Sequence, residues 1–135
     1  MASFVLTNAY LSVGAVDLSD YCQGVTLTYE CEVQDDTAFG DTTRSGAGGL
    51  KNWSLSGDML QSFSTGTVDL TLFSLVGATC AVIVRSSATA ASATNPNFNG
   101  TGILTSYQPI GGAVGDIAKA PISIVAAGTL TRTTT

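Results

Sequence analysis

Apolar and polar residues alternate along most of this 135-residue chain. A period of two is typical of β-strands that bury one face and expose the other. The clearest case is GVTLTYECEV at 24–33, where apolar side chains alternate with threonines and with Glu30 and Glu32. NWSLSGDMLQSF at 52–63 begins in the same way over its first seven residues. We therefore predict two half-buried strands, each with a polar outer face.

Three further segments predict strands. TCAVIVRS at 79–86 is a short apolar run rich in β-branched residues, as expected for a central strand. In GILTSYQPI at 102–110 and APISIVAAGTLTRTT at 120–134, threonine and serine alternate with isoleucine, leucine and valine. All three segments favour strands that contribute to one core.

The segment STGTVDLTLFSLVG at 64–77 breaks this rhythm. Val68, Leu72, Leu75 and Val76 are spaced i, i+4, i+7 and i+8, which is typical of a helix that buries one face. Another strand remains the alternative, because the first apolar residues also alternate. The residues that suit the ends of such a helix are Ser64, Thr65 or Thr67 as a start cap, Asp69 near the positive end of the helix dipole, and Gly77 as the stop.

Six or seven short strands with one helix predict a mainly β fold of the β-sandwich or barrel type, with one flanking α-helix. The length suits a single domain, so we expect residues 1–135 to form one. Polar connections rich in glycine or small residues follow at 34–50, 87–100 and 111–116.

The connection at 34–50 is the longest of these. It contains DDTAFGDTTRSGAGGL at 35–50, which opens with paired acids and ends with three glycines among four residues. Only Ala38, Phe39 and Leu50 are sizeable apolar residues in it. Because the stretch is too long for a tight hairpin turn and too polar for a core, we expect an extended loop without a single shape of its own.

Composition points towards association between copies. Charged residues are only 11% of the chain, so the surface has little charge to hold copies apart. The net charge is −5, and residues 1–58 hold eight acids and two bases, or −6. An acidic first half lacks the basic footprint with which proteins grip nucleic acid.

The chain has few residues that are suited to catalysis. There is no histidine, so the usual general base and triad member are missing. Cys22, Cys31 and Cys80 form no C-x-x-C pair, and we expect free thiols in a reducing compartment and no zinc site. The N-terminus lacks the features of a signal peptide, and no apolar run approaches the ~18 residues of a membrane span. We expect no enzyme, no cofactor and no membrane binding.

Three narrower alternatives stay open at this point. Asp35, Asp36 and Asp41 together have the ligand chemistry for calcium, although their spacing is not that of an EF-hand loop and a solvated loop is the simpler interpretation. Two carboxylates such as Asp58 and Asp69 are the groups of a glycosidase pair. The single tryptophan, Trp53, is either core, interface or a platform for carbohydrate.

A likeness to a known family lies in six segments taken together, without any single diagnostic motif. In chain order they are VDLSDYCQGVTLTYE (16–30), TAFGD (37–41), GGLKNWSLSGDMLQSF (48–63), VDLTLFSLVG (68–77), VIVRSSATAASATNPNFNGTGILTSYQPIGGAVGD (82–116) and AAGTLTRTTT (126–135). Their order and spacing resemble the small tail tube (major tail) proteins of long-tailed bacteriophages over almost the whole chain.

This resemblance implies a structural virion protein. Six copies would close into a ring, and rings would stack into the hollow tail tube through which DNA is delivered. The loop at 34–50 would reach the neighbouring ring and order only on assembly. The expected inter-ring contacts are Asp35, Asp36, Phe39, Arg44 and Leu50.

The polar face of 24–33 or of 52–60 would line the lumen, because acidic and hydroxylated walls repel phosphates and let DNA slide. The lumen candidates are Glu30, Glu32, Ser54, Ser56 and Asp58. Expected partners are the chain itself, tail terminator and tail tip or baseplate proteins, the tape measure protein during assembly, and DNA in transient, non-specific passage. The expected place is the virion tail, assembled in the host cytoplasm.

Two other functions stay open on the sequence alone. A capsid decoration protein, or another virion protein, has a similar size and a β-rich, threonine-rich sequence. A small cytosolic β-sandwich binding module or enzyme would have a concave apolar pocket and would be a monomer.

Overall fold

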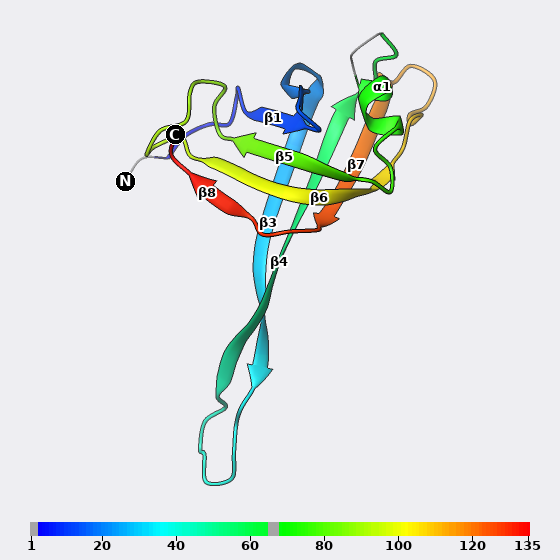
Figure 1. The fold of residues 1–135 in the computed structure, drawn as a ribbon. Helices are drawn as coiled ribbons and strands as arrows, with labels where there is room; N and C mark the ends of the chain where they lie inside the picture. The colour runs from blue at the N-terminus through cyan, green and yellow to red at the C-terminus, as the bar shows by residue number, and fades with distance from the viewer. Residues whose placement is uncertain (1–2, 65–67) are drawn as a thin grey trace.

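The computed structural model describes residues 3–64 and 68–135 (Figure 1). In these ranges the strands are joined by turns, by longer loops at 36–45, 86–96 and 108–118, by one 3-10 turn and by one short helix. In chain order the elements are β1 (Tyr10–Val13), β2 (Val16–Asp17), the 3-10 turn (Ser19–Tyr21), β3 (Cys22–Asp35), β4 (Gly46–Leu60), α1 (Val68–Phe73), β5 (Thr79–Arg85), β6 (Asn97–Tyr107), β7 (Lys119–Ala126) and β8 (Thr131–Thr133).

All strands belong to one antiparallel sheet with the order β2-β1-β5-β6-β7-β4-β3, while β8 also pairs with β6. The expected mainly β class with one helix is confirmed, in the form of an open sheet of eight strands. The count exceeds the expected six or seven. Residues 10–17 form a small β1–β2 hairpin, and the expected strand at 120–134 splits into β7 and β8.

The sheet curls over its own core, so that β1, β5 and β6 cross in front of β3 and β4 (Figure 1). Alternation along the strands decides which side chains face inwards. On β4 the odd-numbered residues 53–59 are buried, while Ser56 and Asp58 are exposed. The buried apolar residues are Leu11, Val13, Leu18, Trp53, Leu55, Met59, Val68, Leu72, Cys80, Val82, Val84, Leu104, Ala120, Ile122 and Ile124.

Trp53 lies at the centre of this core. Its side chain is only 2% exposed, and its Nε1 donates a hydrogen bond to the carbonyl of Gly128 at 2.9 Å. The ring packs directly over β6, where a Cβ added at Gly100 would lie 2.6 Å from Trp53 Cζ2. Glycine at that position is therefore required by the close approach of the ring. A tryptophan buried in this way is not a platform for carbohydrate.

The helix is shorter than its sequence pattern indicates. α1 covers Val68–Phe73, and it buries Val68 and Leu72 as expected. The prediction is wrong for Val76, which is 48% exposed, because the helix ends before that residue. Gly77 is not the helix stop; its φ of +81° serves the turn that leads into β5.

The sequence also predicted which residues stabilise the start of this helix. Asp69 lies in the first turn, as predicted. Its carboxylate accepts a hydrogen bond from the Tyr107 hydroxyl at 2.8 Å, which ties α1 to β6. The proposed caps Thr65 and Thr67 lie outside the described residues.

The expected loop at 34–50 is largely a β-hairpin. β3 and β4 stay paired as far as Asp35 and Gly46, so residues 46–50 belong to β4 and the connecting loop is only 36–45. The ribbon projects away from the sheet (Figure 1). We call residues 30–51 the arm.

Glycines of the arm accommodate a twisted ribbon. A Cβ added at Gly46 would lie 2.7 Å from Val33 Cγ1, and one at Gly49 would lie 3.4 Å from Gln34 Cγ. Side chains of β3 therefore lie across the partner strand, as the strong twist of a two-stranded ribbon requires. In the sequence these glycines suggest a flexible loop, but in the structure they leave space for the side chains of β3.

Candidate assembly surfaces

The first candidate surface is the outer face of β3 and β4. The strand register places Thr28 opposite Ser54, Thr26 opposite Ser56, and Glu30 opposite Asn52. The lumen candidates Glu30, Glu32, Ser56 and Asp58 are exposed, and Ser54 is half-buried. The structure thus brings Glu30, Ser54, Ser56 and Asp58 onto one face, while Glu32 lies further out along the arm.

The same face continues across the centre of the sheet. Ser56 is opposite Ser123 on β7, and Thr105 Oγ1 on β6 donates a hydrogen bond to the Ser123 carbonyl at 3.1 Å. The strand segments that build it are 24–30, 54–58, 101–105 and 121–125, and they contain no lysine or arginine. Hydroxyls, small apolar groups and two carboxylates cover this face, so it has no cation with which to hold a phosphate.

The second surface is the edge of the sheet at β3. This strand has 14 residues and pairs only with β4, so its other edge is unpaired within the described parts of the chain. Long unpaired edges are templates for a strand from another chain. At the opposite end of the sheet the chain covers β1 itself, through β2 and through bonds of the Leu11 amide and carbonyl to Ser19 Oγ and the Leu18 amide, so among the described residues only the two-residue β2 presents an edge there.

A hollow of about 300 Å³ borders the β3 edge. Val25, Leu27 and Tyr29 of β3 line one side of it, and Val84 and Phe98 line the other. The curled sheet is therefore open between its two halves at the place where β3 lacks a neighbour.

The third surface is the tip of the arm, which hydrogen bonds hold in shape. Asp35 accepts hydrogen bonds from the Thr37 amide and from Arg44 Nη1, both at 2.9 Å. The Thr37 hydroxyl accepts from the Ser45 amide at 2.7 Å, and Asp41 Oδ2 accepts from the Ala38 amide at 2.8 Å. The expectation of a stretch without a shape of its own is wrong, because these polar side chains bond to the backbone of their own loop.

The hydrogen bonds also set the charge state of Asp35. Bonds from Thr37 hold the pKa of this carboxyl below its ordinary value. Asp35 and Arg44, which form an ion pair, therefore serve the loop itself. Of the predicted inter-ring residues, Phe39 is fully exposed and Leu50 is 78% exposed, so these two are available to a partner. Asp36 is exposed as well.

Sequence reasoning missed a fourth surface, at the end of the molecule that carries α1. Apolar side chains from three neighbouring segments are exposed there, and we call them the α1-end patch. The segments are joined by hydrogen bonds from the Gln61 amide to the Ala118 carbonyl and from the Asp69 amide to the Ser62 carbonyl, both at 3.1 Å. Its members are Phe63, Leu70, Phe73, Val76, Ile110, Val114 and Ile117.

The sequence contained a weak signal for this patch. Leu70 and Phe73 fall off the helical stripe that Val68 and Leu72 define, so one side of α1 had apolar residues with nothing to cover them. Val114 is a lone apolar residue in the glycine-rich connection at 111–116. Neither observation alone distinguishes a contact surface from an ordinary exposed side chain.

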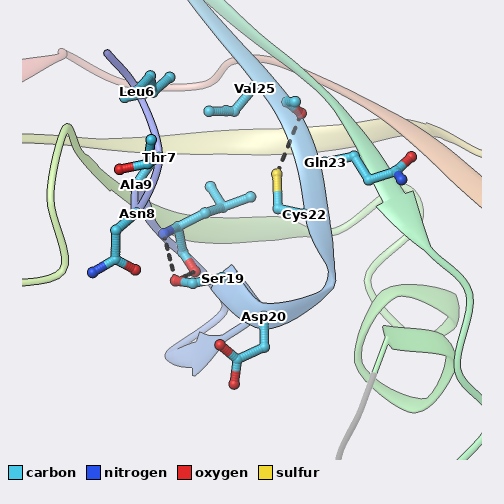
Figure 2. A pocket seen from close by; sticks show the side chains of 11 residues that line it. Leu6, Thr7, Asn8, Ala9, Ser19, Asp20, Cys22, Gln23 and Val25 are labelled. Carbon is cyan, nitrogen blue, oxygen red and sulfur yellow. Dashed lines mark hydrogen bonds between the residues drawn. The ribbon is translucent and has the colours of Figure 1, made fainter. Parts of the chain in front are cut away.

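A polar hollow of about 230 Å³ lies between the N-terminal segment and the 3-10 turn (Figure 2). Ser19 Oγ accepts a hydrogen bond from the Leu11 amide at 3.0 Å, and the Cys22 thiol donates one to the Gly24 carbonyl at 3.2 Å. Burial raises the pKa of Cys22, which keeps it a thiol. These groups stabilise the turn and provide no activated nucleophile.

The other chemical alternatives find no support in the geometry. Within residues 3–64 and 68–135, no three histidine, cysteine or acidic side chains gather as metal ligands, and Asp35 and Asp41 bond to different partners. Asp58 lies on the outer face of β4, whereas Asp69 bonds to Tyr107. No helix in the described ranges is long and apolar enough to cross a membrane.

The sequence itself finds no match among known protein families or curated proteins. Solved structures do match. A chain in the virion of a native gene transfer agent particle superposes with a TM-score of 0.75 and 16% identity, covering 93% of this chain and 95% of that one. A chain in the tail of an empty gene transfer agent particle, refined with C6 symmetry, gives a TM-score of 0.67 and 17% identity over 84% of this chain and 82% of that one.

A third match is the SPP1 Dit protein, described as a paradigm of the hub adsorption apparatus in phages that infect Gram-positive bacteria. The TM-score is 0.55 at 16% identity, and the chain covers half of the Dit protein. Identities this low establish the fold. The chain has a phage tail-tube-like fold, and the resemblance seen in the sequence is confirmed at that level.

Proposed function

We propose that this chain is the structural subunit of a phage-type tail tube, in which six copies form a ring and rings stack into a hollow cylinder that delivers DNA. The observation that carries the proposal is an open sheet with a long unpaired edge at β3 and a short one at β2, whose fold matches a C6-symmetric tail over 84% of the chain. A subunit of this kind is incomplete alone, because its neighbours supply the missing strand contacts.

Ring closure uses the two edges. The β3 edge of one copy pairs with the β1–β2 edge of the next, which is a heterologous contact that closes after a fixed rotation. The neighbour also covers the apolar hollow between Val25 and Phe98. Main-chain hydrogen bonds and apolar burial then act at the same interface.

The polar outer face lines the lumen. Glu30 and Asp58 repel phosphates, and serine and threonine hydroxyls between them offer only weak, interchangeable contacts. DNA therefore slides past without releasing counterions to a basic wall. Replacing Glu30 and Glu32 with lysine should slow DNA ejection and leave assembly intact; unchanged ejection would show that these residues face elsewhere.

Stacking uses the arm, with Phe39 and Leu50 as its apolar contacts to the next ring. Because the arm is already a hairpin, docking orders few additional residues and costs less conformational entropy than folding a loose loop. The tail terminator, the tip or baseplate proteins and the tape measure protein are the partners at the ends and inside of the tube. The subunit assembles in the host cytoplasm and resides in the virion tail.

Electron microscopy of the purified protein at high concentration tests this function. Negative stain should show hollow cylinders of uniform width, and side-view averages should show stacked rings. A variant with an edge-blocking proline at Tyr29, an exposed β3 residue whose amide points to the free edge because the even-numbered β3 residues bond to β4, should remain folded but fail to form rings. A protein that stays monomeric and binds only preformed capsid shells would instead be a decoration protein.

A further inference from the structure

Two opposite ends of the molecule carry exposed apolar side chains. The tip of the arm carries Phe39, and the α1-end patch lies at the other end of the long β3–β4 ribbon (Figure 1). We propose that the α1-end patch of one copy is the docking site for the arm tip of a second copy. This inference rests on the stacking role of the arm proposed above and identifies the surface that receives it.

The shape of the arm restricts where its partner can lie. The paired part of β3 beyond Tyr29 has six residues, which extend about 20 Å at ~3.3 Å per residue. Because the tip extends so far from its own sheet, the copy that contacts it must be shifted in the direction in which the arm projects. Copies stacked head to tail in that direction face the tip with their opposite end. That end carries the α1-end patch.

A preformed hollow of about 420 Å³ adjoins the patch, and Ile117 is the patch member that lines it. Its wall is fixed by a hydrogen bond from the Lys119 amide to the Gly111 carbonyl at 3.2 Å. The 113–116 turn beside it is closed by the Asp116 amide bonding to the Ala113 carbonyl at 3.0 Å. The residues around the hollow are Gln108, Gly111, Gly112, Asp116, Ile117, Lys119 and Pro121.

The chemistry of the two ends is complementary. Phe39 is the largest exposed apolar side chain on the tip, and Ile117 and the ring of Pro121 offer an apolar floor for it. Residues 35–45 contain three acids and one base, for a net charge of −2. Lys119, exposed at the hollow, can pair with one of those acids, while the neighbouring Asp116 carboxylate accepts a hydrogen bond from the Ala113 amide.

Cross-linking tests the contact directly. A chain that carries both Phe39→Cys and Ile117→Cys, in a Cys31→Ser background, is treated with a short bismaleimide after assembly. A head-to-tail contact joins each chain to the next, so a denaturing gel should show a ladder of dimers, trimers and larger species. Either single variant should give no ladder. The matched control combines Phe39→Cys with Thr105→Cys, which lies on the outer face of the sheet.

Mixing two defective chains gives a second, independent measurement. Phe39→Asp removes the apolar tip but leaves the patch, and Ile117→Asp damages the patch but leaves the tip. Each alone should stop at single rings by sedimentation. When preformed rings of the two variants are mixed, they should form two-ring stacks and nothing longer. The intact tips of the Ile117→Asp ring can dock on the intact patches of the Phe39→Asp ring, and the two outer surfaces of that pair are both defective.

The outcomes separate this inference from the proposed function. Tubes without a ladder, or a ladder only from the Thr105 control pair, overturn the α1-end docking site while the tube role stands. A protein that forms neither rings nor tubes overturns the tube role and the docking site together. A ladder from the Phe39–Ile117 pair with two-ring stacks in the mixture supports the docking site.

Discussion

The base and the arm of the β3–β4 ribbon have the same antiparallel strand pairing but different surroundings. The base packs on the core, where Leu55 and Trp53 are buried and Val25 is half-buried. In the arm the alternation continues, yet Val33 is 75% exposed. Alternation therefore predicts that a strand exists and which face is apolar, but it does not say whether the same chain or another copy covers that face.

The two halves also set their shape by different means. At the base, burial fixes the register, because a slip of one residue would move the apolar side chains to the outer face. In the arm, the register shifts between Cys31 and Val33, and glycines make room for β3 side chains. The tip is then closed by the hydrogen bonds of Asp35 and Thr37. The arm is stabilised locally, so it can change without unfolding the core.

The largest contrast is expected at a cross-strand pair in the base of the ribbon, just before the arm begins. Trp53 and Tyr29 are directly opposite each other, yet Trp53 is 2% exposed and Tyr29 is 52% exposed. Trp53→Ala should lower the free energy of unfolding by about 3–5 kcal/mol, because it opens a cavity in the core. Urea denaturation of the dilute, unassembled subunit measures this. The matched change Tyr29→Ala should cost much less, because that side chain is half exposed, and equal losses would show that Tyr29 is packed as tightly as Trp53.

Two glycines offer the next comparison. A Cβ at Gly100 meets the Trp53 ring at 2.6 Å, whereas one at Gly48 meets Cys31 Sγ at an ordinary 3.7 Å. Gly100→Ala should therefore cost about 1–3 kcal/mol through overpacking. Gly48→Ala should change stability by less than about 0.5 kcal/mol, as expected for a surface position. Thermal unfolding of both variants checks the difference; a destabilised Gly48→Ala would mean that the arm is coupled to the core.

Much of the fold could be predicted from the sequence. Period-two alternation located β3, β4, β6 and β7, since burial of one face leaves a local trace, and a short run of β-branched residues located β5. The short β1–β2 hairpin left too few residues for a pattern. The length of α1 was overestimated because Val76, at helical spacing, is in fact placed by its bridge to Leu104 on β6. That is a long-range contact, which no local pattern reports.

The candidate surfaces, too, could be predicted from the sequence only in part. Exposure of Glu30, Ser56 and Asp58 followed from alternation. The hairpin form of the arm did not, because acids and glycines in a row are ambiguous between a loose loop and a twisted ribbon. The hydrogen bonds that Asp35 accepts from Thr37 and Arg44, together with the β3–β4 pairing, decide between them. The α1-end patch was missed because it combines three segments that are distant in the sequence.

A smaller effect is expected where α1 is attached to the base of the sheet. The Tyr107 hydroxyl donates to Asp69 at 2.8 Å and accepts from Gln61 Nε2 at 2.9 Å. Tyr107→Phe should cost about 0.5–1.5 kcal/mol, the usual net worth of a hydrogen bond. A double-mutant cycle with Asp69→Asn, measured by urea unfolding, isolates the pair. Additive losses would show that the two side chains do not stabilise each other.

The smallest effect is expected at the tip of the arm and should appear as a pH dependence. Hydrogen bonds from Thr37 lower the pKa of Asp35, so the folded tip binds the ionised carboxylate better than the protonated one. The stabilisation is therefore fully present at neutral pH and is lost as the pH falls through the lowered pKa. Amide hydrogen exchange at Thr37 and Ser45 should accelerate over that acidic range relative to its intrinsic rate, while amides of β6 stay protected.

Asp35→Asn is the matched control, because it keeps the shape of the side chain but cannot titrate. Its tip should be less protected at neutral pH and should show no acidic transition at Thr37. If the transition persisted in the variant, another acid would hold the tip, and Asp41, which bonds to the Ala38 amide, would be the next to replace. A transition that spread to β6 would contradict the independence of the arm, since it would show that tip and core unfold together.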